Sequence, residues 1–422
     1  MPMLHGTPIS RKQLVLGSLA CAMAGLFYCY EFVLRIVPGV LQAELSEALG
    51  HLSAATFGQL AALYYFSYSP MQMPVGMLMD RFGPRRLLTF ACLCCTVGSW
   101  MFSYSASLMI VGFGRFLVGL GSSFAFVGVL SLAVHWLPRR YFSLVTGLAT
   151  TLSMFGVMYG EVKVTELASS LGLHQVLGLL VILGAVLTGL IFFVVRDGPG
   201  GDQVKKQSFS LFLTQVWRVL ISPHVWLIGL VGACLYTSLS VFGELWGKSY
   251  LELAHHLTKM DAARSISMMF LGWAVGAPLA GYWSDRTGRR VFPLMVGALM
   301  SLICISLVLY CPHLSYFSLN TLLFLYGVFS GTEIIVFIMA KENTGALVSG
   351  TVFAAANMIV SLGGVIFQPL VGFLLDTFGS GQMMGAEHVY GIADYQVALS
   401  VLPLSLLLVI FIGFFLKDHD PK

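Results

Sequence analysis

Long runs of apolar residues, separated by short polar segments, dominate the chain. Runs such as 177–195 and 401–416 lack the apolar–polar alternation of a membrane β-strand. A helix needs about 20 apolar residues to cross a bilayer, and backbone inside lipid must satisfy its own hydrogen bonds. The pattern therefore predicts an all-α membrane protein with twelve transmembrane helices. We expect them at 13–37, 53–79, 87–105, 108–136, 142–168, 172–195, 223–250, 262–284, 291–311, 316–340, 345–376 and 394–416.

The amino-acid composition also indicates that lipid forms part of the solvent around this protein. The 422 residues are 57% hydrophobic and only 10% charged, whereas soluble domains carry about 25% charged residues. The apolar stretch that follows Arg11 and Lys12 is longer than that of a signal peptide, so we expect it to remain as the first helix. The eight cysteines show no metal spacing or disulfide framework. We expect no metal, no cofactor and no enzymatic activity.

Basic residues fall mostly on one side of the predicted spans. The other side holds only Lys259 and Arg264, with Lys248 close by at a helix end. Basic loops remain in the cytoplasm, so we expect both termini to be cytoplasmic. An even number of spans follows, which agrees with twelve.

The chain also repeats itself. The segment Gly76-x3-Asp80-Arg81-x-Gly83 follows the second span, and Gly281-x3-Asp285-Arg286-x-Gly288 follows the eighth. We expect the first glycine of each copy to allow close helix approach, the aspartate to pair with basic residues or cap a helix, and the inner glycine to turn with positive φ. Internal repeats are typical of secondary transporters. The sequence therefore predicts an N-terminal six-helix half at 1–195, a cytoplasmic linker at 196–221 and a C-terminal six-helix half at 222–422.

These repeated loops resemble the hallmark cytoplasmic loops of the major facilitator superfamily. The element Arg115-x3-Gly119-x-Gly121 is similar to another motif of that superfamily. The resemblance implies that spans 1, 4, 7 and 10 line a central cavity that opens alternately to each side. The fifth span reads Gly156-x3-Gly160 without the Gly-Pro of many antiporters, which counts against a drug/proton antiporter.

Ionisable residues inside membrane spans are costly and are functional candidates. Each span expected to line the cavity carries at least one. Glu31 precedes Arg35 by four residues, and Glu244 precedes Lys248 by four, which predicts that each pair shares one helical face. Two interpretations remain open: a site for a substrate anion and a proton, or ion pairs that close an outer gate.

We assign candidate roles on this basis. The substrate-binding candidates are Arg115, Tyr30, Arg35, Tyr64, Tyr236, Glu333 and Asn357. The candidates for proton coupling or gating are Glu31, Glu244, Lys248 and Glu161. The cytoplasmic gate motif comprises Gly76, Asp80, Arg81, Gly83, Gly281, Asp285, Arg286 and Gly288.

A narrower resemblance suggests a substrate class. The strings at 30–38, 53–58, 242–247 and 364–376 resemble the phagosomal nutrient transporters of intracellular bacteria, which implies uptake of an amino acid or nucleoside. The chain is more distantly similar to organic anion and sugar-phosphate carriers. Ser240 stands where those phosphate carriers have a second cation, which favours a zwitterion or monoanion over a phosphate.

We therefore expect a symporter of the bacterial cell inner membrane. It would use the proton gradient to import a small polar metabolite such as an amino acid. The alternatives are an exporter of a siderophore or drug, and a carrier of an organic anion, nucleoside or sugar phosphate. We expect the small-molecule substrate and the lipid bilayer as its only partners, no nucleic acid, and a monomer.

Overall fold

The first group of helices comes from the N-terminal part of the chain. The structure, a computed structural model, describes residues 11–198, 209–342, 349–379, 383–384, 387–416 and 418. The first group consists of α1 (Arg11–Val40), α2 (Gln42–Ala48), α3 (Ala54–Met71), α4 (Val75–Phe82), α5 (Pro84–Tyr104), α6 (Leu108–Ser122), α7 (Ala125–Trp136), the 3₁₀ turn η1 (Arg139–Tyr141), α8 (Phe142–Leu171) and α9 (Leu173–Val194).

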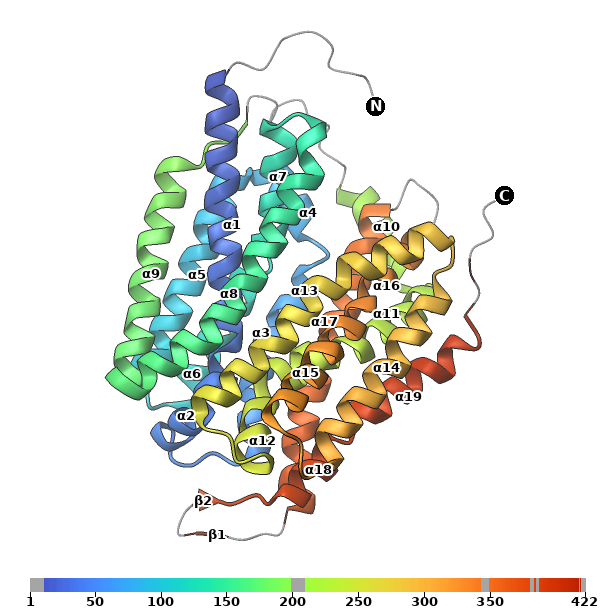
Figure 1. Ribbon diagram of the computed structural model, residues 1–422. Coiled ribbons are helices and arrows are strands. Elements are labelled where there is room, and N and C mark those ends of the chain that lie inside the picture. Colours follow the sequence, from blue (N-terminus) through green and yellow to red (C-terminus); the bar gives the residue numbers. More distant parts are fainter. Residues whose placement is uncertain are drawn as a thin grey trace.

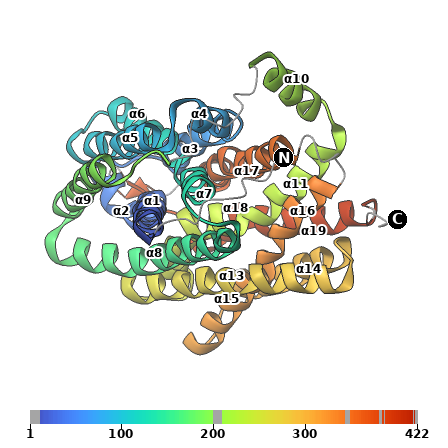
Figure 2. The ribbon, with the colours of Figure 1, turned by 90° about the horizontal axis from the view of Figure 1, so that it is seen from above.

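The second group comes from the C-terminal part and lies beside the first (Figures 1 and 2). It consists of α10 (Phe209–Leu220), α11 (Pro223–Thr237), the π-helix η2 (Ser238–Trp246), α12 (Gly247–Ala254), α13 (Lys259–Thr287), α14 (Val291–Tyr310), α15 (Tyr316–Ser330), the 3₁₀ turn η3 (Gly331–Glu333), α16 (Ile334–Glu342), α17 (Ser349–Phe378), α18 (Ile392–Leu399) and α19 (Val401–Gly413).

Eleven helices of the described residues are long and apolar enough to cross a membrane. The expected span at 53–79, which the structure divides into α3 and α4, is not among them. Pro70 and Pro74 explain the division, since each lacks an N–H and clashes with the preceding turn of a helix. The all-helical membrane fold is confirmed, while the count of twelve spans stays a prediction.

Three further elements were not predicted. The short helix α2 lies in an expected outer loop, and α10 lies in the expected linker, of which 199–208 are outside the described residues. The strands β1 (Met383–Met384) and β2 (Glu387–His388) form a small antiparallel hairpin in another expected outer loop. We call the face with α10 and the start of α1 the inner face, and the face with α2 and the hairpin the outer face (Figure 1).

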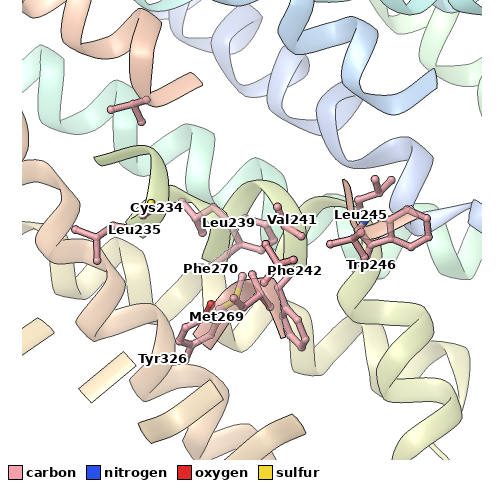
Figure 3. Close-up of a cluster of buried hydrophobic side chains, with 14 of the residues drawn as sticks. Cys234, Leu235, Leu239, Val241, Phe242, Leu245, Trp246, Met269, Phe270 and Tyr326 are labelled. Carbon is pink, nitrogen blue, oxygen red and sulfur yellow. The ribbon is translucent and has the colours of Figure 1, made fainter. Parts of the chain in front are cut away.

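The two groups meet mainly along three helix pairs. These are α3 with α17, α8 with α13, and α1 with η2. Apolar side chains anchor η2 on its own group, because Phe242 packs against Phe270 and Tyr326 of α13 and α15 (Figure 3). Its ring centroid lies 6.3 Å from that of Tyr326. The opposite side of η2 is thus directed at α1 and α17 of the interface.

Glycines set the closest helix crossing within the second group. A Cβ at Gly272 would lie 2.0 Å from the carbonyl oxygen of Phe324, and one at Gly327 would lie 2.0 Å from that of Met269. Small residues let membrane helices approach closely, and the packing then contributes to association. The crossing of α13 and α15 therefore requires glycine on both helices.

We predict that Gly327→Ala lowers the midpoint of thermal unfolding in detergent, because the added methyl overlaps backbone that cannot move aside. Overpacking of this kind costs about 1–3 kcal/mol of unfolding free energy. The matched control is Gly189→Ala on α9, where a Cβ would meet no atom within 4 Å. It should leave the midpoint unchanged or raise it. Equal losses in both variants would show that the crossing is not the constraint.

Candidate functional site

A buried guanidinium lies between two carboxylates at the junction of the two groups. Arg35 Nη2 of α1 is 3.1 Å from Glu31 Oε1, and Arg35 Nη1 is 3.9 Å from Glu244 Oε1 of η2. All three side chains are at most 4% exposed. The Glu31–Arg35 pair predicted from the i, i+4 spacing is confirmed, and Arg35 also links the two groups.

Tyrosines surround this charged cluster. The hydroxyl of Tyr64 donates to Glu31 at 3.0 Å, and that of Tyr65 donates to Glu244 at 2.5 Å. Tyr236 accepts a hydrogen bond from Arg35 at 3.1 Å and lies 3.0 Å from the Tyr65 hydroxyl. The cluster therefore holds one cation, two acids and three phenols within hydrogen-bonding reach, a combination suited to binding charged groups and moving protons.

The π-helix explains why Glu244 faces this cluster. A π-helix has more residues per turn than an α-helix, so the side chains of η2 point in other directions than a regular helix would give them. Glu244 accordingly binds Tyr65 and approaches Arg35, whereas Lys248 donates to the Val40 carbonyl at 2.7 Å and to Thr165 at 3.0 Å. Glu244 and Lys248 both approach α1, but they bind different partners and form no ion pair with each other.

Lys248 belongs to a second buried cluster nearer the outer face. It contacts Thr165 of α8, and Glu161 lies one turn away with its carbonyl accepting from the Thr165 hydroxyl at 2.7 Å. Glu161 is 2% exposed, and its Oε2 has no hydrogen-bond partner among the described residues. The two candidates Glu161 and Lys248 thus lie together, on opposite groups.

Arg115 has a different environment from Arg35. Its Nη1 and Nη2 donate to the carbonyls of Leu34 and Arg35, both at 2.7 Å. Pro38 has no N–H, so the Leu34 carbonyl lacks its usual helical donor four residues on. Arg115 replaces that donor and holds α1 one turn before Pro38, and its guanidinium also lies 4.8 Å from the ring centroid of Tyr64.

Three other substrate-binding candidates lie away from the charged cluster. The Tyr30 hydroxyl donates to the Leu180 carbonyl of α9 at 2.9 Å, inside the first group. Glu333 lies on η3, is 4% exposed, and its Oε2 has no partner among the described residues. Asn357 of α17 donates to Gln72 at 2.9 Å. The structure brings together Glu31, Arg35, Glu244, Tyr64 and Tyr236, but not these three.

The repeated loops form turns on the inner face. Gly83 has φ +81° and Gly288 has φ +63°, which confirms the predicted positive φ. Asp285 pairs with Arg290 at 2.6 Å, and Arg290 also binds Glu342 at 2.8 Å, which raises the pKa of Arg290. Asp80 is exposed and makes no hydrogen bond or ion pair with the described residues.

The first glycines of the loops do not behave as predicted. A Cβ at Gly76 or Gly281 would meet no atom within 4 Å, so neither glycine supports a close helix approach in this arrangement. Arg81 lies over the Phe82 ring at 5.6 Å, and Arg286 donates to Tyr282 at 3.0 Å. Both arginines are exposed on the inner face.

The inner side of the interface is open. A cavity of about 520 Å³ lies between α3–α4, α7 and α17. Asp80 and Arg81 line it on one wall, and Gly350 and Thr351 line it on another. Because these residues lie at the inner ends of α4 and α17, the cavity reaches the inner face.

The outer side is closed by contacts between the groups. A Cβ at Gly39 of α1 would lie 2.2 Å from the Glu244 carbonyl of η2, so these backbones touch. Asp376 of α17 accepts from the backbone N–H groups of Ala54 and Ala55 at 3.1 and 2.9 Å. This carboxylate caps the N-terminus of α3, where negative charge is favourable.

An ion pair adds to the closure at the outer rim. Lys259 of α13 lies 2.6 Å from Glu44 of α2. Burial alone raises the pKa of Glu44, and Lys259 more than offsets this effect, so the pKa of Glu44 lies below its usual value. The contacts at the outer face and the cavity at the inner face together define an arrangement that is open on the inner face.

Sequence reasoning missed several residues of these sites. Tyr65 follows the Tyr64 candidate on α3 and Gln72 comes directly after that helix, and no spacing distinguishes them from membrane-interface aromatics and amides. Arg290 and Glu342 pair across 52 residues, and Asp376 caps a helix 322 residues away. Only the two prolines beside Gln72 could have indicated a broken, functional segment.

Two helical groups, a buried polar site between them and an opening on one side define a membrane transporter. Residues 19–368 match the family model of the Major Facilitator Superfamily, which is more than half of the chain, and the chain belongs to this superfamily. It is thus a transporter and not an enzyme.

Curated relatives share low identity over most of their length. The chain is 24% identical to the probable sulfoacetate transporter SauU of Cupriavidus necator, over 67% of either chain. It is 22% identical to the lysosomal dipeptide transporter MFSD1 of Danio rerio, over 90% of this chain and 85% of the relative. It is 24% identical to the D-galactonate transporter of Escherichia coli O6:H1, over 83% and 87%.

Solved structures share the fold. A mutant of the nucleoside transporter NupG aligns with a TM-score of 0.75 at 12% identity, covering 95% of this chain and 99% of that one. A bacterial homologue of the human lysosomal transporter Spinster, inward-facing and unoccupied, aligns with a TM-score of 0.71 at 16% identity, covering 95% of each chain.

We predict that Arg115 acts by holding α1 rather than by contacting the substrate. Arg115→Met should lower the midpoint of thermal unfolding, because the Leu34 carbonyl loses its donor at a cost of about 1–3 kcal/mol. In a Pro38→Ala background the alanine N–H can bind that carbonyl, so the same substitution should cost less. Strictly additive losses in this double-mutant cycle would contradict the assignment.

Proposed function

We propose that the protein is a proton-coupled importer of a small polar metabolite, of the amino-acid class, that works by alternating access. The observation that carries the proposal is the buried Arg35 between Glu31 and Glu244 at the junction of the two groups. A cation at that place suits a substrate carboxylate, and the two acids suit a substrate ammonium group or a proton. We take the inner face to be cytoplasmic, in the bacterial cell inner membrane, and the protein to be a monomer.

The relatives' substrates support an anionic group on the substrate. Sulfoacetate, dipeptides and galactonate, named for three relatives, all carry a carboxylate. Dipeptides share the zwitterionic charge of amino acids. The resemblance to the phagosomal nutrient transporters of intracellular bacteria favours uptake of an amino acid rather than export.

Coupling follows from the charges of the cluster. Glu244 is the more weakly held acid, because its oxygen lies 3.9 Å from Arg35 whereas that of Glu31 lies at 3.1 Å. In the proposed cycle the substrate carboxylate takes the place of Glu244 beside Arg35. Glu244 then accepts a proton, since an unpaired carboxylate is costly away from water. For import, both bind while the outer side is open, and the Arg35–Glu244 contact forms again once substrate and proton have left on the inner side.

A second candidate is a carrier of organic anions. Two of the three relatives named above carry acids without an amine, sulfoacetate and galactonate. Arg35 could serve such an acid equally well, whereas two carboxylates beside it favour a substrate that also carries positive charge. No observation on the described residues specifically favours export of a siderophore or drug. The same holds for transport of a nucleoside or sugar phosphate.

A ligand screen tests the substrate class. Purified protein is heated with each of the twenty L-amino acids, with dipeptides, with sulfoacetate and D-galactonate, and with nucleosides and sugar phosphates. A ligand that binds only the folded state raises the unfolding midpoint, by about 2.7 kcal/mol of stability at one hundred times its Kd. We expect stabilisation by amino acids that is lost in Arg35→Met. Stabilisation by galactonate or sulfoacetate alone would instead select the organic-anion carrier.

We predict that Glu244→Gln separates transport from coupling. The amide keeps the shape of the side chain and removes its proton exchange, so accumulation driven by a pH gradient should be lost. Exchange of labelled for unlabelled substrate should continue, because it needs no net proton movement. The matched control is Glu166→Gln, an exposed acid on α8. Accumulation at the wild-type level in Glu244→Gln would exclude Glu244 as the coupling residue.

A further inference from the structure

A break in a membrane helix lies at the floor of the inner cavity. Residues 72–74 separate α3 from α4, and Gln72 and Met73 line the cavity. Irregular backbone at membrane depth is tolerated where it is buried in protein or lines a water-filled cavity. In transporters such breaks place polar groups at substrate sites. Gln72 therefore lies at a position where transporters place side chains that bind substrate.

The Gln72 amide is only half satisfied. Its Oε1 accepts a hydrogen bond from Asn357 Nδ2 of α17 at 2.9 Å, across the junction of the two groups. Its Nε2 has no partner among the described residues, although the side chain is 6% exposed. A buried amide donor without a partner costs free energy that a ligand acceptor can recover.

Tyr68 connects this amide pair with the charged cluster. The centroid of the Tyr68 ring lies 5.3 Å from the Arg35 guanidinium carbon. Tyr68 is partly exposed, and it is one helical turn before Gln72 on α3. A polar path thus runs from Arg35, past Tyr68, to Gln72 and Asn357, and ends in the open cavity.

We propose that Gln72 and Asn357 form a second substrate subsite, on the release path, that binds an acceptor oxygen of the substrate. The free N–H of Gln72 donates to a carboxylate or sulfonate oxygen as the substrate leaves Arg35 for the inner side. This subsite rests on the proposed transport function. It would bind the substrate only from the inner side. A neutral amide donor holds the anion weakly, which suits release.

The test measures KM for exchange separately from the outer and the inner side, in right-side-out and inside-out membrane vesicles. The labelled probes are L-alanine, glycylglycine, D-galactonate and sulfoacetate, all of which carry a carboxylate. The variants are Gln72→Met, which removes the whole amide at similar volume, and Gln72→Glu, which keeps an acceptor but removes the donor. Gln59→Ala is the matched control, because Gln59 is an exposed glutamine on the same helix.

We expect KM from the inner side to rise about five- to tenfold in both Gln72 variants, as the loss of one hydrogen bond implies. KM from the outer side, and both values in Gln59→Ala, should stay at the wild-type level. A wild-type inner KM in Gln72→Glu would overturn the donor role. An equal rise on both sides would overturn the sided subsite in favour of a general structural effect.

The probes separate this inference from the proposed function. Exchange of D-galactonate or sulfoacetate without exchange of L-alanine or glycylglycine overturns the amino-acid assignment. A one-sided effect of the Gln72 variants on those acids still supports the subsite. Exchange of none of the four probes overturns both.

Discussion

The buried guanidinium of Arg35 is the constraint on which the arrangement depends. A charge within the membrane is costly unless it is paired, and Arg35 finds its acids on both groups, Glu31 on α1 and Glu244 on η2. Such pairs are poor sources of stability, because desolvation offsets the attraction. Removing one partner is nevertheless expensive, so any separation of the groups at this place must supply Arg35 or Glu244 with a new partner. A substrate and a proton can meet that need.

The closed outer side and the open inner side use different interactions. Backbone contact at Gly39, the Asp376 cap on α3 and the Lys259–Glu44 pair join the groups near the outer face. On the inner face the ion pairs of Asp285 with Arg290 and of Arg290 with Glu342 remain within the second group. The cavity can therefore open there without breaking an ion pair between the groups among the described residues.

Irregular segments of the membrane helices carry the polar chemistry. The π-helix η2 directs Glu244 toward Arg35, Pro38 leaves free a carbonyl that Arg115 binds, and the break at Gln72 lines the cavity. A regular helix satisfies its own backbone and presents a fixed spacing of side chains. Departures from regularity free polar groups and change that spacing, which is why they coincide with the site.

The sequence by itself determined the membrane class, most of the helix spans, the repeated loops with their positive-φ glycines, and the pairing of Glu31 with Arg35. Each of these depends on composition or on local spacing along one helix. Only the tertiary structure decided that Glu244 and Lys248 bind different partners, that Tyr30 donates to the Leu180 carbonyl, and that Asp376 caps a helix 322 residues away. Those outcomes depend on which helices become neighbours and on where a helix leaves regular geometry. Residue spacing along the chain contains no measure of either, because contacts between helices are set by packing across the whole bundle.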